Sequence, residues 1–156
     1  MKHILIYLLS IIFITGCVTM PNTNSVPQKI DFNLKYNLNS QTVFEIDSAK
    51  SIYMSNTIPG NQNQRSISLS DEQKIKIYNE FKRLNIEKLD LEQSSLTVNC
   101  VESVEKQLTF NFDDNRFDYK WGCALGFESI ELNNMYEFIQ EQSNVKFGSS
   151  PIYKIE

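Results

Sequence analysis

The stretch Leu108–Trp121 reads LTFNFDDNRFDYKW, and it decides the fold of this chain. Hydrophobic and polar residues alternate on both sides of Asp113–Arg116, which is the pattern of two strands joined by a turn. If the turn is centred on Asp114 and Asn115, facing residues have numbers that sum to 229. The predicted pairs are Leu108 with Trp121, Phe110 with Tyr119, and Phe112 with Phe117. A shift of one residue would move half of these side chains to the opposite face. We therefore predict an antiparallel hairpin with one buried, aromatic face.

Other segments show the same alternation. In Ile30–Leu38 every second residue is hydrophobic, which predicts a half-buried strand. Further strands are expected at 42–46, 49–54, 66–69 and 96–101. Thr57–Arg65 is polar and contains Pro59 and Gly60, so it is expected to be a loop.

Two segments are expected to be helices. Ser70 and Gln73 have the spacing of a capping box, and Ile77, Phe81 and Leu84 follow at helical intervals. A second helix is expected to begin near Ser129, with an apolar face made of Leu132, Met135, Tyr136 and Ile139. The order of elements predicts an α+β fold in which two helices pack on an antiparallel sheet.

The beginning of the chain has a different character. Ile4–Ile14 is almost entirely apolar but spans only ~16 Å as a helix, which is too short for a bilayer core of about 30 Å. It has the length of the apolar core of a signal peptide. The expected organisation is a signal peptide at 1–16 that is removed, a flexible tether at 17–28, and a single domain at 29–156.

The segment Ile14-Thr15-Gly16-Cys17 resembles the lipobox of bacterial lipoproteins. The resemblance implies that the Cys17 thiol carries a diacylglyceryl group, that cleavage occurs before Cys17, and that the protein is anchored to a membrane of the cell envelope. Val18 stands where aspartate would imply the inner membrane, so the resemblance implies the outer membrane, facing the periplasm, if the source is Gram-negative. The domain is also similar in layout to small uncharacterised lipoprotein domains, a likeness that implies no activity.

Cys100 and Cys123 are the cysteines that remain once Cys17 is lipidated. An exported chain meets an oxidising environment, so this pair is expected to form a disulfide that staples the hairpin region. A redox-active pair would need closer spacing or a positive environment, and Glu102 and Glu105 lie nearby instead.

The composition argues against several kinds of chemistry. The one histidine, His3, lies in the leader, so the mature chain has no Ser-His-Asp triad and no imidazole ligand for a metal. Ser103–Lys106 and Ser143–Lys146 match S-x-x-K, but the companion motifs are missing. Asp113–Asn115 lacks the spacing of a calcium loop. We expect no catalytic residues, no metal and no cofactor.

The charge balance restricts the partners. Lys and Arg number 15 against 19 Asp and Glu, and no basic run is present, which argues against nucleic acid. Three functions stay open. The preferred one is a non-enzymatic, membrane-anchored envelope lipoprotein that binds another protein or helps an assembly. The alternative is a periplasmic inhibitor or immunity protein against a toxin or hydrolase, and the third is an enzyme that uses carboxylates alone.

Overall fold

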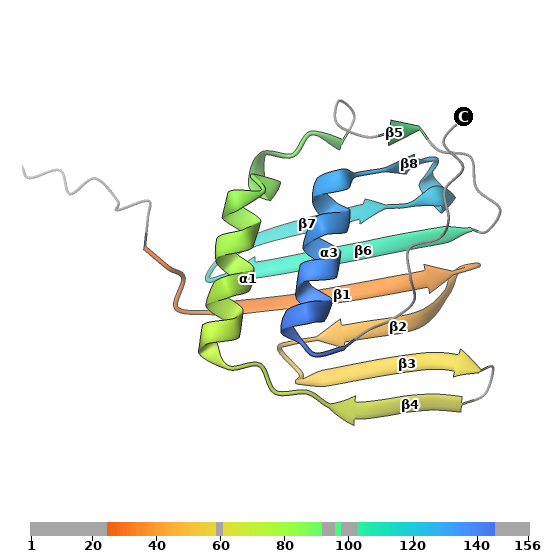
Figure 1. The fold of residues 1–156 in the computed structure, drawn as a ribbon, viewed down its shortest axis with the longest axis horizontal. Coiled ribbons are helices and arrows are strands. Elements are labelled where there is room, and N and C mark those ends of the chain that lie inside the picture. Colours follow the sequence, from red (N-terminus) through yellow and green to blue (C-terminus); the bar gives the residue numbers. More distant parts are fainter. Residues whose placement is uncertain (1–24, 59–60, 92–95, 98–102, 146–156) are drawn as a thin grey trace, which may run out of the picture.

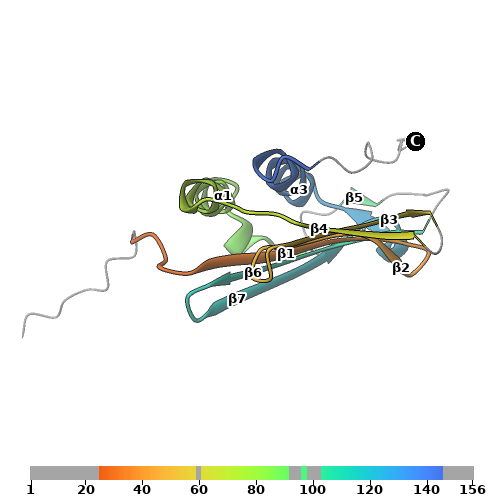
Figure 2. The same ribbon diagram turned by 90° about the horizontal axis from the view of Figure 1, so that it is seen from below.

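A computed structural model gives the fold and describes residues 25–58, 61–91, 96–97 and 103–145. Within these residues, a six-stranded antiparallel sheet has the strand order β4-β3-β2-β1-β6-β7. Both long helices lie on one face of it, as Figure 1 and Figure 2 show. The predicted α+β class, with two helices packed on an antiparallel sheet, is confirmed.

The elements have the following bounds. The large sheet consists of β1 (Ile30–Leu38), β2 (Gln41–Asp47), β3 (Ile52–Ile58), β4 (Asn61–Ser66), β6 (Val104–Phe112) and β7 (Asn115–Trp121). The helices are α1 (Asp71–Arg83) and α3 (Ile130–Gln142). The short elements are η1 (Ile86–Lys88), β5 (Leu96–Thr97), η2 (Cys123–Leu125) and β8 (Phe127–Glu128), and β5 pairs with β8.

The core lies between the helices and the sheet. Alternation along β1 places Phe32 and Leu34 on the helix-covered face, where both are buried. They lie opposite Phe110 and Leu108 of β6. From α1, Phe81 packs its ring 4.8 Å from that of Phe110. The hydrophobic alternation of the sequence therefore describes the faces of the central strands correctly.

Both helices begin where the sequence predicts. The Ser70 hydroxyl accepts from the amide of Gln73 at 3.2 Å, and the Gln73 side chain accepts from the amide of Ser70 at 2.9 Å, so the capping box is confirmed. Ser129 caps α3 by accepting from the amide of Leu132 at 3.2 Å. The predicted apolar face of α3 is buried.

The register predicted for the β6–β7 hairpin is wrong by two residues. Leu108 faces Tyr119, Phe110 faces Phe117, and Phe112 faces Asn115. The turn consists of Asp113 and Asp114 alone, and Asp113 has a left-handed backbone with φ 51°. A shift of two residues leaves every side chain on its predicted face, because strand side chains alternate with a period of two.

The predictions for residues 49–69 also need correction. The strand expected at 49–54 begins only at Ile52, because the chain turns after Asp47, whose carboxylate accepts from the amide of Lys50 at 3.0 Å. The loop expected at 57–65 contains β4, and the strand expected at 66–69 is absent, since residues 67–70 lie outside strands. β4 is polar, but its backbone pairs with β3, and backbone hydrogen bonds do not require apolar side chains.

Of the strand expected at 96–101, β5 covers Leu96–Thr97. The rest of that segment and the chain after Val145 lie outside the described residues.

Candidate functional site

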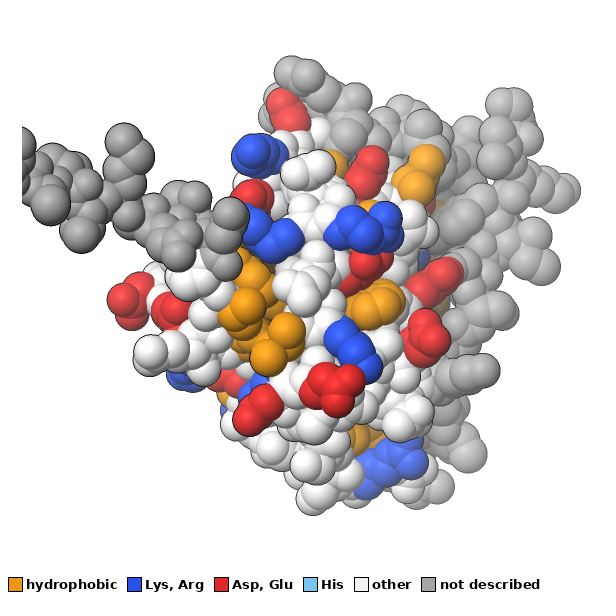
Figure 3. All heavy atoms as spheres, turned by 60° about the vertical axis from the view of Figure 1, so that its left-hand side comes forward, with side chains coloured by type: hydrophobic (Ala, Val, Ile, Leu, Met, Phe, Trp, Pro, Cys, Tyr) orange, Lys and Arg blue, Asp and Glu red, His pale blue; other side chains and the backbone are white. Residues whose placement is uncertain are grey.

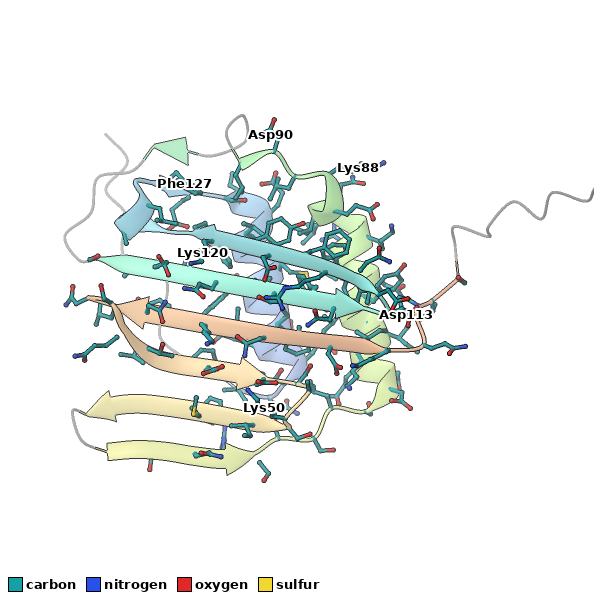
Figure 4. The ribbon with its side chains drawn as sticks, turned by 180° about the vertical axis from the view of Figure 1, so that it is seen from behind. Lys50, Lys88, Asp90, Asp113, Lys120 and Phe127 are labelled. Carbon is teal, nitrogen blue, oxygen red and sulfur yellow. The ribbon has the colours of Figure 1, made fainter. Side chains whose placement is uncertain are left out.

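The sheet has one face that no described helix covers, and we call it the open face. Figure 2 shows both helices on the opposite side, and Figure 4 shows the open face toward the viewer, with Lys120 and Lys50 labelled. Strand alternation places polar side chains here, in register across four strands. They are Asp31, Asn33, Lys35 and Asn37 of β1, Glu45 and Asp47 of β2, Glu105, Gln107, Thr109 and Asn111 of β6, and Arg116, Asp118 and Lys120 of β7.

Hydrogen bonds and ion pairs connect the side chains of β1 and β2 across the open face. The amide nitrogen of Asn33 donates to Glu45 at 2.7 Å, and the Lys35 ammonium lies 3.5 Å from the same carboxylate. Asp31 contacts the ammonium groups of Lys74 at 3.3 Å and Lys29 at 3.5 Å. These pairs hold the acidic side chains in place against the sheet, and the exposed fractions of Asp31 and Glu45 are only 7% and 8%.

The β6–β7 side of the open face is organised around Asp118. Its carboxylate accepts from Thr109 at 2.7 Å and from Arg116 at 2.7 and 2.9 Å. The hydrogen bond from the Arg116 guanidinium lowers the pKa of Asp118, against a smaller opposing effect of burial. Asp118 therefore stays ionised at neutral pH.

Asp47 has the same character at the β2 end of the face. Burial alone would raise its pKa, but hydrogen bonds and charge from Lys50, whose ammonium lies 2.7 Å away, outweigh burial and lower it. A hydrolase that works with two carboxyl groups needs one of them protonated, which requires a raised pKa. The pKa values of Asp47 and Asp118 are both shifted in the other direction.

A shallow hollow of about 470 Å³ runs along the open face. Its lining includes Asn33, Lys35, Asp47, Gln107, Thr109, Asn111, Arg116, Asp118 and Lys120. The hollow offers amide, hydroxyl, carboxylate and cationic groups side by side. Among the described residues, no group of three or more His, Cys, Asp and Glu side chains is placed to hold a metal ion. Such a surface can exchange hydrogen bonds and ion pairs with another polar surface.

A second hollow, of about 310 Å³, lies between α1 and the β6–β7 turn, beside the point where the described chain begins. Figure 3 shows hydrophobic side chains gathered between charged ones at this end of the molecule. Phe81 and Phe112 line it but are 0% and 4% exposed, with ring centroids 4.9 Å apart. Because these rings are already used in the core, the open face is the better candidate site.

One charged residue that sequence reasoning missed is Lys106, which lies on the helix-covered face of β6 with an exposed fraction of 2%. Its ammonium donates to the side-chain oxygen of Asn133 at 2.7 Å and lies 3.5 Å from Glu128. Burial lowers the pKa of Lys106, and the Glu128 charge opposes that shift. Asn133 also accepts from Trp121 at 2.9 Å and donates to Glu128 at 2.8 Å, so the cluster joins β6, β7, β8 and α3. The sequence alternation does predict this burial, because Lys106 stands two residues before Leu108 and therefore on the same, buried face of the strand.

The residues singled out in the sequence are not brought together into a catalytic site. Ser103 is exposed while Lys106 is buried beneath α3, so the first S-x-x-K match is not assembled, and Lys146 of the second match lies outside the described residues. Asp113 is a turn residue whose carboxylate accepts from the amide of Lys29 at 2.9 Å.

The predicted lipid-anchor residue Cys17 lies outside the described residues, as does Cys100. Cys123 belongs to η2, directly after β7. The predicted disulfide between Cys100 and Cys123 therefore stays a prediction.

No protein-family model, curated protein or solved structure matches this chain. Among the described helices, none has the length and apolar character needed to cross a membrane.

Proposed function

We propose that this protein is a lipid-anchored envelope lipoprotein without enzymatic activity, which binds another protein through the open face. The observation that carries the proposal is the composition of that face. It is a broad surface of paired charges, amides and hydroxyls on one side of the sheet, while the helices occupy the other side. Interfaces between proteins that also exist separately are only about as apolar as the rest of the surface and carry about ten direct hydrogen bonds, so polar groups of this kind can form part of one.

The positions of the aromatic residues favour a protein over a nucleic acid or a sugar. Alternation places the rings of Phe32, Phe110 and Tyr119 on the helix-covered face, so these strands offer no ring on the open face for a base to stack on. At the margin of the open face, β3 adds the half-buried Ile52 and Met54. A protein partner can match such a mixture of apolar, polar and oppositely charged groups.

The absence of enzymatic activity is supported by the carboxyl groups along the hollow. The lowered pKa values of Asp47 and Asp118 keep both groups ionised, so neither is suited to act as a general acid at neutral pH. Each accepts hydrogen bonds from a neighbouring cationic residue, which is an arrangement suited to recognition.

The anchor is proposed from the lipobox, with Cys17 as the acylated residue and the outer membrane, facing the periplasm, as the location in a Gram-negative source. The described chain starts at Ser25. Eight residues from Cys17 to Ser25 reach at most ~29 Å at about 3.6 Å each, which keeps the domain near the lipid surface. A Cys100–Cys123 disulfide that staples the hairpin region to its flanking segment is part of the same proposal.

The binding proposal is tested by capture from detergent-solubilised envelopes with tagged, full-length protein. Lys120→Glu reverses an exposed charge on the open face, and Lys88→Glu makes the same change on η1, away from that face (Figure 4). A partner captured by the wild-type protein and by Lys88→Glu should be lost or weakened with Lys120→Glu. Equal capture by both variants would show that binding uses another surface.

The anchor is tested separately by growth with an alkyne fatty acid. Wild-type protein should take up the label and Cys17→Ala should not. An unlabelled wild-type protein would contradict the lipoprotein assignment without bearing on the open face.

A further inference from the structure

Among the described residues, the large sheet ends in two edge strands, β4 and β7, and the direction of their backbone groups follows from the register. The amide of Ile67 donates to the carbonyl of Ser51 at 3.0 Å, so the odd-numbered residues before it in β4, such as Arg65, direct their backbone groups toward β3. Gln64 and Ser66 therefore direct their N–H and C=O groups away from the sheet. On β7, the residues whose N–H and C=O groups point away from the sheet are Arg116, Asp118 and Lys120.

The two edges differ in charge. The β7 residues whose backbone groups point away from the sheet are all charged. Charged side chains are a common means by which edge strands avoid pairing with other chains. The corresponding residues of β4 are neutral, and the strand reads NQNQRS, without proline or lysine. Its one cation, Arg65, belongs to the residues whose backbone groups face β3, and its guanidinium lies over the ring of Tyr53, 4.4 Å from the centroid. Figure 1 shows β4 as the last strand, beyond the two helices.

We infer that β4 is an interaction surface for a second copy of this chain, which pairs with it antiparallel through its own β4. A two-fold axis beside Gln64 sets Gln64 opposite Gln64 of the second copy, with their outward N–H and C=O groups exchanging hydrogen bonds. Arg65 then faces the neutral Asn63 of the second copy. A register centred on Arg65 would instead place two guanidinium groups directly opposite each other, which is unfavourable.

The lipid anchor of the proposed function, on which this point rests, agrees with that symmetry. The two-fold axis of such a continuous sheet is perpendicular to the sheet. A symmetric pair anchored in one membrane has its axis along the membrane normal, so the doubled sheet lies parallel to the lipid surface. The two tethers then leave from opposite ends of the pair at the same height, and both reach the membrane. The two open faces become one surface of twice the extent.

The molar mass of the full mature chain in a density-matched detergent, measured by sedimentation equilibrium, tests the inference. Wild-type protein should give the mass of two chains at micromolar concentration. Gln64→Pro removes an outward N–H without breaking a hydrogen bond to β3, and proline is tolerated at such edge positions. It should give the mass of one chain with an unchanged circular dichroism spectrum. The matched variant Lys120→Pro makes the same change on the β7 edge and should remain a dimer.

Gln64→Glu provides a second measurement that does not depend on the tolerance of β4 for proline. It places two carboxylates opposite each other at the axis, so the dissociation constant should rise at least tenfold and fall again in high salt, which screens the repulsion. A monomeric wild-type protein would overturn the inference, and so would a Gln64→Glu dimer of unchanged affinity. Neither result depends on the acylation of Cys17 or on capture by the open face. A failure of the dimer inference can therefore be distinguished from a failure of the proposed function.

Discussion

Replacing Lys106 by Met separates the electrostatic role of the buried cluster from its packing role. Methionine keeps an unbranched apolar side chain beside Trp121 and Tyr136, whose ring centroids lie 6.0 and 5.7 Å from the Lys106 ammonium. The change removes the 2.7 Å hydrogen bond to Asn133 and the positive charge 3.5 Å from Glu128.

The expected cost follows from burial. The Lys106 and Glu128 side chains are only 2% and 5% exposed, so the substitution removes the Lys106 charge from beside a buried carboxylate. Breaking a buried ion pair in this way costs about 3–5 kcal/mol. Since domains of this size are stable by about 5–15 kcal/mol, Lys106→Met should remove a large part of the free energy of unfolding.

Urea denaturation followed by circular dichroism measures this loss as a lower midpoint at an unchanged slope. The control is the double variant Lys106→Met/Glu128→Gln, which removes both charges and keeps the oxygen that accepts from Asn133. Its stability should return to within ~1 kcal/mol of the wild-type value, because no charge is left buried alone. A single variant that costs less than ~1 kcal/mol, or a double variant whose cost is the sum of the two single ones, would refute the reasoning.

Three further predictions concern stability and covalent structure. Burial lowers the pKa of Lys106 below the ordinary value of 10.5, so between these two pKa values the unfolded chain binds more protons than the folded chain. In this pH range the free energy of unfolding of the wild-type protein should therefore rise with pH, and that of Lys106→Met should lack this rise. A series of urea titrations at different pH values measures both. Gly122→Ala should lower the free energy of unfolding by at least ~2 kcal/mol, because its φ is +123° and a Cβ would lie 2.7 Å from the Val104 carbonyl oxygen. The control Gly126→Ala, at φ +79° with open space around it, should lower it by only about 1 kcal/mol. Mass spectrometry of alkylated, non-reduced peptides from envelope-derived protein should show Cys100 joined to Cys123, and reduction should lower stability by about 2–5 kcal/mol; two alkylated thiols would contradict the bridge.

Features that depend on neighbours in sequence could be predicted from the sequence. The Ser70–Gln73 capping box needs only residues three apart, and the alternation in Ile30–Leu38 separates a buried face from a polar one without knowledge of the partners. The same alternation also predicts the polar open face, since Asn33 and Lys35 alternate with the hydrophobic Phe32, Leu34 and Tyr36. The contacts of this face with Glu45 and the hollow along it could not be predicted, because they depend on the order of the strands, which no local pattern provides.

The failures have equally specific causes. Alternation in the β6–β7 hairpin defines faces but leaves registers that differ by two residues indistinguishable, and the tight turn at Asp113 decided between them. β4 was missed because a polar edge strand is held by its backbone, so its side chains leave no hydrophobic pattern. The burial of Lys106 was missed because lysine side chains are mostly exposed, and its partners Glu128 and Asn133 come from elements more than twenty residues away.

The position at which the chain enters the sheet determines how the domain responds to force. The chain leads directly into β1, where the backbone of Lys29 exchanges contacts with Asp113, and β1 is hydrogen-bonded on both sides, to β6 along Ile30–Leu38 and to β2 along Asn33–Leu38. These hydrogen bonds run perpendicular to the strands. A pull on the preceding segment along the axis of β1 therefore acts in shear on the hydrogen bonds to β6 and to β2, and loads all of them at the same time. A pull across the strands would instead break the bonds one after another. We therefore expect the domain to withstand tension applied through the proposed tether, and its lifetime under such a load to be set by the rate at which the hydrogen bonds at the centre of the sheet break.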